Sequence, residues 1–137
     1  MTIAIKAQLT TMEVQLASLA WQAICGTSIS GLGSGAATEI DTTTLCSAAK
    51  EFVMGIKDEG TMTFAVNYDP ADVGQKRLQY LRDNQEVGAF RMTLTDVGSE
   101  TWTWSGYVTS APLGDVTPDT VYTMVYSIRI TGAITVA

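Results

Sequence analysis

The sequence contains no histidine and only two cysteines, Cys25 and Cys46. Without histidine, neither a Ser-His-Asp triad nor a Cys-His pair can form, and the commonest zinc ligand is missing. The two cysteines lack the paired spacing of metal or redox motifs, so we expect two reduced, packed thiols. These absences exclude most familiar enzyme designs, and we predict a non-enzymatic protein without catalytic residues, metal site or cofactor.

Charge is also scarce. Charged residues make up 16% of the chain and hydrophobic residues 46%, with a mean hydropathy of +0.16, whereas soluble domains average about a quarter charged residues. A small monomer has a large surface for its volume, so this composition indicates that other chains cover part of that surface. We therefore expect self-association.

The charge that is present is mostly negative. Eight basic and fourteen acidic residues give a net charge of −6 and an isoelectric point near 4.4. Such a chain repels phosphates, so we predict no tight nucleic-acid binding, although DNA could pass without specific binding. Gln8, Glu13 and Gln15 interrupt the N-terminal apolar run, so we expect no signal peptide, no membrane contact and a protein that begins in the cytoplasm.

Alternation of apolar residues dominates the chain. Its 137 residues fit one domain, 1–137, in which residues 1–20 form an N-terminal arm or first strand. The alternation predicts strands over residues 61–68, 89–94, 100–110 and 120–132, and more weakly over 12–16 and 21–30. Gly106 lies on the apolar side of its strand and indicates a bulge or a close backbone approach. We expect a mainly β, sandwich-like or barrel-like fold.

Hydroxyl side chains occupy the opposite sides of these strands where a solvated sheet would carry lysine and glutamate. They are Thr93, Thr95, Thr101, Thr103, Ser105, Thr109, Thr123 and Thr131. One interpretation is the high β propensity of threonine. The other is a sheet covered on both faces, with the core on one side and a neighbouring subunit or an enclosed channel on the other.

One segment, residues 70–85, breaks the β period and predicts an amphipathic helix that flanks the sheet. Asp69 is placed as the N-cap, Pro70 suits the first turn, and Gly88 supplies the freedom to turn into the next strand. The basic residues of the helix are Lys76, Arg77 and Arg82. They form either a solvated face or a charge partner for an acidic patch on a neighbouring copy.

A long irregular connection covers residues 31–59, between two alternating stretches. GLGSGA at residues 31–36 follows a strand, but no helix follows it, so a flexible loop is favoured over a dinucleotide site. The acidic pairs Asp58-Glu59 and Glu39 with Asp41 indicate solvated turns, not catalytic carboxylates. So long a loop in a small domain usually serves a function.

Four signatures in order resemble the tail tube (major tail) proteins of long-tailed bacteriophages. The first runs from IDTTTL at residues 40–45 through KEFVMG at 50–55 to DEGTMTF at 58–64. The others are the capped helix after NYDP at 67–70, the strand WSGYVTS at 104–110, and the closing strand into Thr131-Gly132. The resemblance extends from about Trp21 to the C-terminus.

The resemblance implies a structural virion protein with one flanking helix. It also implies hexameric rings that share a continuous inner β-barrel and stack into a tube. Tape measure protein and genome DNA would pass through the channel without specific binding, and terminator and tail tip or baseplate proteins would be partners. Assembly would take place in the host cytoplasm, and the final location would be the virion tail.

By the same resemblance, residues 31–59 are a loop between subunits and rings. The implied self-assembly residues are Asp41, Thr42, Thr43, Lys50, Glu51 and Phe52. Phe52 is the expected anchor, because buried aromatic residues commonly dominate interface energies. The alternative is a loop folded back on its own core.

Two other functions are also considered. One is the tube protein of a contractile tail, a tailocin or a type VI secretion system. The other is a ligand-binding β-sandwich in which Trp102 and Trp104 form a stacking platform, although their shared face with Val108 favours core packing.

Overall fold

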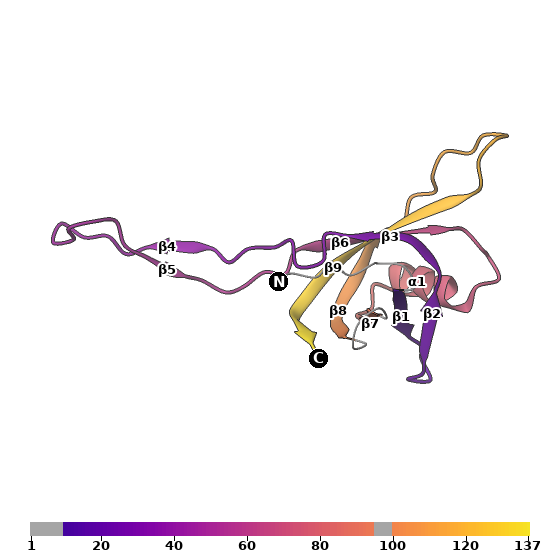
Figure 1. The fold of residues 1–137 in the computed structure, drawn as a ribbon, viewed down its shortest axis with the longest axis horizontal. Coiled ribbons are helices and arrows are strands. Elements are labelled where there is room, and N and C mark those ends of the chain that lie inside the picture. Colours follow the sequence, from indigo (N-terminus) through magenta and orange to yellow (C-terminus); the bar gives the residue numbers. More distant parts are fainter. Residues whose placement is uncertain (1–9, 95–99) are drawn as a thin grey trace, which may run out of the picture.

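The computed structural model describes residues 10–94 and 100–137 as a mainly β fold with one helix, as the alternation predicts (Figure 1). The elements are β1 (Thr11–Gln15), β2 (Trp21–Ile24), β3 (Gly26–Ser30), β4 (Glu39–Asp41), β5 (Phe52–Met54), β6 (Thr61–Asn67), α1 (Val73–Asn84), β7 (Gly88–Thr93), β8 (Thr101–Ser110) and β9 (Thr123–Val136). Seven strands form one antiparallel sheet in the order β2-β1-β7-β8-β9-β6-β3, and β4 pairs with β5 separately.

The two edges of the large sheet are connected by consecutive residues of the chain. Its two edge strands, β2 and β3, are consecutive in the chain and are separated only by Cys25, so one bent strand pairs with β1 at one end and with β6 at the other. The register shifts between Gly26 and Ser28. A Cβ at Gly26 would lie 2.2 Å from the ring of Phe64, so only glycine lets the strand cross the core there. The single strand predicted over residues 21–30 is therefore two strands.

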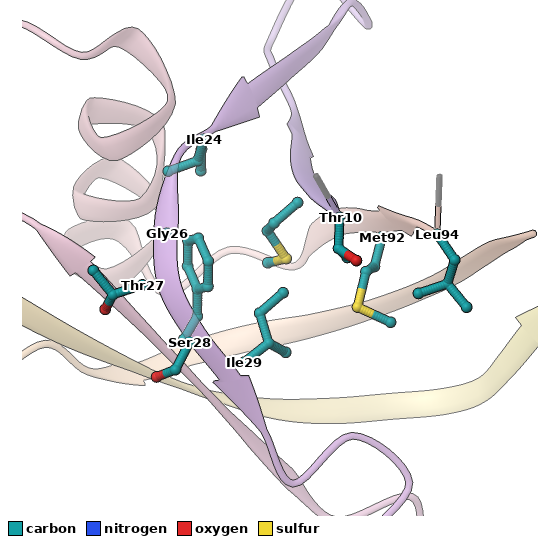
Figure 2. A pocket seen from close by; sticks show the side chains of 10 residues that line it. Thr10, Ile24, Gly26, Thr27, Ser28, Ile29, Met92 and Leu94 are labelled. Carbon is teal, nitrogen blue, oxygen red and sulfur yellow. The ribbon is translucent and has the colours of Figure 1, made fainter. Parts of the chain in front are cut away.

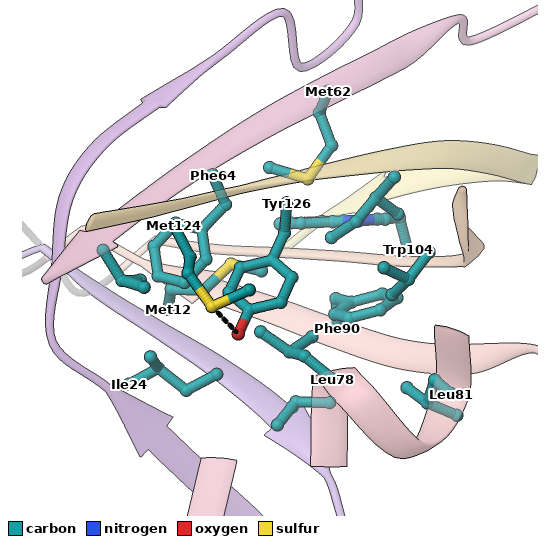
Figure 3. Packing of buried hydrophobic residues seen from close by; sticks show 14 of the residues in the cluster. Met12, Ile24, Met62, Phe64, Leu78, Leu81, Phe90, Trp104, Met124 and Tyr126 are labelled. Atoms are coloured by element: carbon teal, nitrogen blue, oxygen red, sulfur yellow. Dashed lines mark hydrogen bonds between the residues drawn. The ribbon is translucent and has the colours of Figure 1, made fainter. Parts of the chain in front are cut away.

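The core occupies one face of the large sheet (Figure 3). Its buried residues are Met12, Val14, Ile24, Met62, Phe64, Val66, Leu78, Leu81, Phe90, Trp104, Val108, Met124, Tyr126, Ile128 and Ile130. The rings of Phe90 and Trp104 stack with centroids 6.1 Å apart, and Trp102 packs against the cluster. Burial raises the pKa of Tyr126, whose hydroxyl donates to the sulfur of Met124. Trp104 is therefore a core residue, and the favoured prediction that the two tryptophans pack on the core is confirmed over the alternative of a stacking platform for ligands.

The N-cap of helix α1 lies three residues later than predicted. Asp72 is the N-cap, and its Oδ1 accepts from the Gly74 N–H at 3.0 Å. Asp69 accepts instead from the Ala71 N–H at 2.9 Å, which forms a turn before the helix. Buried Gln75 accepts from the Asp69 N–H and donates to the Asn67 carbonyl, so it ties this turn to the helix. The N-cap prediction for Asp69 was wrong.

The C-terminal end of α1 also differs from the prediction. Gln85 takes the left-handed conformation at φ 54°, and its N–H donates to the Leu81 carbonyl. Gly88 begins β7, where an added Cβ would lie 2.5 Å from the Leu81 side chain. Gly88 is thus required for close packing of the helix on the sheet, not for the turn. In the part of the chain described here, no helix is long and apolar enough to cross a membrane.

The non-core face of β6, β7, β8 and β9 carries mostly small side chains, with Asn67, Tyr107 and Val125 among its larger members, and we call it the small-residue face. Its small members are Thr61, Thr63, Ala65, Ala89, Thr93, Thr101, Thr103, Ser105, Thr109, Thr123, Ser127 and Thr131. None of them is buried in the isolated chain. The hydroxyl positions predicted to oppose the core therefore do so, except Thr95, which lies outside the described residues.

Gly106 on β8 lies against the backbone of β9. A Cβ at Gly106 would lie 2.6 Å from the Arg129 carbonyl oxygen, so the predicted close backbone approach is confirmed.

Both cysteines are free thiols, but both are exposed, Cys25 at the β2–β3 bend and Cys46 in the turn between β4 and β5. The prediction of packed thiols is wrong because neither position faces the core.

A shallow apolar hollow of about 350 Å³ opens where the bent strand separates from β1 (Figure 2). Its lining includes Ile24, Ile29, Phe64, Met92 and Leu94. The described lining contains no charged side chain, so it offers a polar ligand no anchor.

Candidate assembly interface

Residues 31–59, which we call the arm, leave the body and project far beyond it (Figure 1). The arm is a β-hairpin and not the irregular loop that the sequence predicts. Glu39 pairs with Met54, Ile40 with Val53 and Asp41 with Phe52. No residue from 31 to 58 is buried. The alternative of a loop folded back on its own core is therefore excluded.

The root of the arm is held by close backbone contacts between its two strands. Gly35 packs so tightly that an added Cβ would lie 1.9 Å from the Asp58 carbonyl oxygen. The Gly35 N–H donates to the Glu59 carbonyl at 3.2 Å, and the Ser34 hydroxyl donates to the Thr61 carbonyl. As predicted, no helix follows the GLGSGA stretch, whose glycines instead permit this contact.

An ion pair joins the root to the sheet. The guanidinium of Arg129 on β9 donates to Asp58 Oδ2 at 2.7 Å, and the Gly60 N–H donates to Oδ1 at 2.8 Å. These bonds, the Arg129 bond above all, lower the pKa of Asp58. Glu59 is only 5% exposed, and Lys57 Nζ lies 3.0 Å from its Oε1 as an ion pair without hydrogen-bond alignment. Asp58 fits the predicted solvated turn, but Glu59 does not.

The predicted assembly residues lie together in the outer half of the arm. The Thr42 N–H donates to the Glu51 carbonyl at 2.9 Å, and the Glu51 N–H donates to the Thr43 hydroxyl at 2.8 Å. Asp41 accepts from the Thr43 N–H, which lowers the pKa of Asp41. Phe52 lies opposite Asp41, and Lys50 is exposed next to Glu51. Bonds of Asp41, Thr42, Thr43 and Glu51 order the arm, while the Phe52 side chain remains 50% exposed.

Side-chain hydrogen bonds also order the tip. The Ser47 hydroxyl donates to Glu51 Oε2 at 3.1 Å and accepts from the Thr44 N–H at 3.0 Å. The Thr44 hydroxyl accepts in turn from the Cys46 N–H. Hydroxyl side chains that bond to nearby backbone groups stabilise turns of this kind. The turn therefore presents Leu45, which it leaves fully exposed.

The arm carries large apolar side chains that the sequence reading missed. They are Ile40, Leu45, Val53, Met54 and Ile56, all at least 49% exposed. An isolated two-stranded hairpin is marginally stable in water, and exposed apolar groups of this size mark interaction surfaces. The sequence could have indicated this surface, because these five apolar residues lie outside every strand that the alternation predicts for the core.

The site offers little for catalysis. Within residues 10–94 and 100–137, no group of three or more histidine, cysteine or acidic residues could hold a metal ion. The carboxylates of Asp41, Glu51 and Asp58 accept from the arm's own backbone, from the Ser47 hydroxyl or from Arg129, and Glu59 pairs with Lys57. The exposed apolar side chains of the arm are those of a contact surface.

Solved structures with the same fold are found in tubes and tails. A chain in the cryo-EM structure of the anti-feeding prophage baseplate matches with TM-score 0.82 and 12% identity over 100% of this chain and 97% of that one. A chain in the tail of an empty gene transfer agent particle, refined with C6 symmetry, matches with TM-score 0.75 and 19% identity over 98% and 99%. The SPP1 tail tube matches with TM-score 0.70 and 12% identity over 97% and 78%.

Comparison with curated proteins finds no match. A family model described as phage tail tube, TTP, lambda-like, matches residues 3–101, which is well over half of the chain. The chain therefore belongs to the lambda-like family of phage tail tube proteins.

Proposed function

We propose that this chain assembles into hexameric rings that stack into a tube, with the arm of each subunit seated on neighbouring copies. The observation that carries this proposal is the set of exposed apolar side chains on a hairpin that leaves its own body (Figure 1). The arm of one subunit would contact a different surface on the next subunit, so that the contact is head-to-tail. Repeating such a contact gives a closed ring when the rotation between neighbouring subunits adds up to a full turn. The sixfold symmetry of two structures with this fold supports six subunits per ring.

The small-residue face is assigned to the channel. Most of its side chains are small, with Tyr107 and Val125 as its larger apolar members, and it has few of the charges that an outer surface would carry. Helix α1 lies on the core side of the sheet, against β8, β2 and β1, and so faces the outside of the tube (Figure 1). The strands of neighbouring copies would then complete a continuous inner β-barrel, which closes exposed sheet edges.

The proposed action is physical transport. Rings stack around the tape measure protein during assembly in the host cytoplasm, and that protein and the genome later leave through the channel of the virion tail. The net charge of −6 supports passage of DNA without specific binding. Terminator and tail tip or baseplate proteins would bind the two ends of the tube. No hydrolysis, cofactor or membrane contact is part of this proposal.

A second candidate is the tube of a contractile tail. A chain from the sheath–tube complex of an extracellular contractile injection system shares this fold, with TM-score 0.72 and 14% identity over 98% of this chain and 91% of that one. A sheath gene beside this one would favour the contractile reading. Its absence from the same gene cluster would favour a tail without contraction.

Substitution Phe52→Asp tests the role of the arm. We expect the variant to keep its fold, because Phe52 makes no part of the buried core, and to lose tube growth, because a carboxylate replaces an apolar anchor. Circular dichroism measures the fold, and negative-stain microscopy of the purified protein measures rings and tubes.

The matched control is Phe52→Leu, which keeps an apolar side chain at the same position. We expect this variant to form rings and tubes with a central channel, as the unchanged protein does. Normal tubes from Phe52→Asp would reject the assignment of the arm. Featureless monomers of the unchanged protein at high concentration would reject the tube itself.

A further inference from the structure

The charged residues of the large sheet are few and lie on one face. Within its described strands they are Glu13 on β1, Arg91 on β7 and Arg129 on β9, all on the side away from the core. The remaining described basic residues lie elsewhere, Lys50 and Lys57 on the arm and Lys76, Arg77 and Arg82 on α1. The small-residue face and its β1 neighbour therefore carry two cations, Arg91 and Arg129.

Each of these two arginines has a carboxylate within hydrogen-bond distance. Arg91 Nη2 lies 2.5 Å from Glu13 Oε2, and its guanidinium lies over the Trp21 ring at 4.5 Å. Arg129 Nη2 lies 2.7 Å from Asp58 Oδ2 at the root of the arm. Lys57, which borders the same hollow as Arg129, is paired with Glu59. Every described cation near this face is thus neutralised locally.

The helix side differs. The contacts of Arg77 are the Gln15 carbonyl and the Tyr80 ring, both uncharged, and Arg82 lies 3.6 Å from Asp83 at an exposed site. On α1, Arg77 has no carboxylate partner among the described residues and Arg82 has only a weak one. Both arginines of the sheet, in contrast, are closely paired with carboxylates. The acidic composition alone does not explain why the cations of the sheet are paired more closely than those of α1, because the chain has enough carboxylates to pair with both groups.

We infer that Glu13 and Asp58 neutralise Arg91 and Arg129 so that the channel wall presents no free cation to a polyanion such as double-stranded DNA. This inference rests on the proposed function, which places the small-residue face in the channel. A free arginine binds phosphate and releases counterions, and a ring of such sites repeated along a tube would retain DNA. The two carboxylates are thus specificity-determining residues of the channel.

The test compares two double variants with the same change in net charge. Glu13→Gln with Asp58→Asn frees both arginines, and Asp115→Asn with Asp119→Asn removes two charges from the exposed connection between β8 and β9. Binding of a DNA duplex of about 20 base pairs is measured across a salt series, with the free subunit and with sedimented tubes. We expect the first variant to bind roughly tenfold more tightly at low salt, with a log–log salt slope steeper by about 2, and the second to resemble the unchanged protein.

Two further variants keep the test decisive. Asp58→Asn alone changes an exposed pair and so leaves the core intact, and it should give about half of the slope change. Adding Arg129→Gln to it should return DNA binding to the level of the unchanged protein. Increased binding that survives Arg129→Gln would overturn the inference.

The outcomes separate the inference from the proposed function. Tubes of normal shape whose DNA binding does not differ between the two double variants would overturn the inference and leave the tube intact. Tighter DNA binding by a free subunit that never forms a channel would support the neutralising pairs and reject the tube.

Discussion

Trp104 is the largest fully buried side chain among the described residues. It is 2% exposed and its ring stacks on Phe90. Removing a buried tryptophan loses its transfer free energy and leaves a cavity, so we expect Trp104→Ala to lower the free energy of unfolding by about 3–5 kcal/mol. Urea unfolding followed by far-ultraviolet circular dichroism measures this loss.

Trp102 provides the matched control on the same strand. It is only partly buried, and its indole N–H donates to the Glu100 carboxylate at 2.7 Å at the start of β8. We expect Trp102→Ala to cost clearly less than Trp104→Ala. Equal losses would mean that the two tryptophans share the core equally and that the assignment of Trp104 as the central residue is wrong.

The start of α1 is decided by one side chain. Because Asp72 accepts from the Gly74 N–H, we expect Asp72→Ala to lower the free energy of unfolding by about 1 kcal/mol. Asp69→Ala removes only a turn bond before the helix and should cost less. Thermal unfolding of both variants measures the difference, and a larger loss from Asp69→Ala would restore the cap that the sequence predicts.

The same helix illustrates what the sequence could and could not predict. The pair Asp69-Pro70 has the residue types of an N-cap and a first helical turn, so its location was predicted to within one turn. Buried Gln75 shifts the boundary, because its bonds to Asp69 and Asn67 fix a turn that a local pattern does not contain. Strands such as β6 were predictable because one buried face imposes alternation, and Met62, Phe64 and Val66 obey it.

The arm was harder to predict for a related reason. Strands β4 and β5 are three residues long and exposed on both faces, so burial imposes no period on them. Resemblance to the tail tube family supplied Asp41, Lys50 and Phe52, but residue patterns alone gave no reason to choose them. The exposed apolar residues Leu45 and Ile56 were missed because no other part of their own chain covers them.

The whole molecule divides its surface chemistry among three regions. The small-residue face has paired charges, α1 has the less closely paired cations, and the arm has exposed apolar side chains. In a tube these regions would meet the channel, the outside and the neighbouring copies respectively. A single acidic composition would thus serve three surroundings of the proposed tube, because charge is distributed by position instead of being spread evenly.

This division predicts different protease sensitivity before and after assembly. Lys50 lies near the tip of the arm and Lys57 near its root, where it is 74% exposed. We expect trypsin to cleave the free subunit rapidly after both residues and the tube slowly after Lys50, because neighbouring copies cover the arm. Mass spectrometry of the fragments over time gives the rates at each site.

The body of the same molecule supplies the internal control. Arg77 lies within α1 and donates to the Gln15 carbonyl, so its cleavage should be slow in both states. Because no residue from 31 to 58 is buried, the nicked free subunit should keep the circular dichroism spectrum of the intact one. Cleavage after Lys50 at equal rates in the free subunit and in the tube would show that the arm stays exposed on assembly and would contradict its proposed contacts.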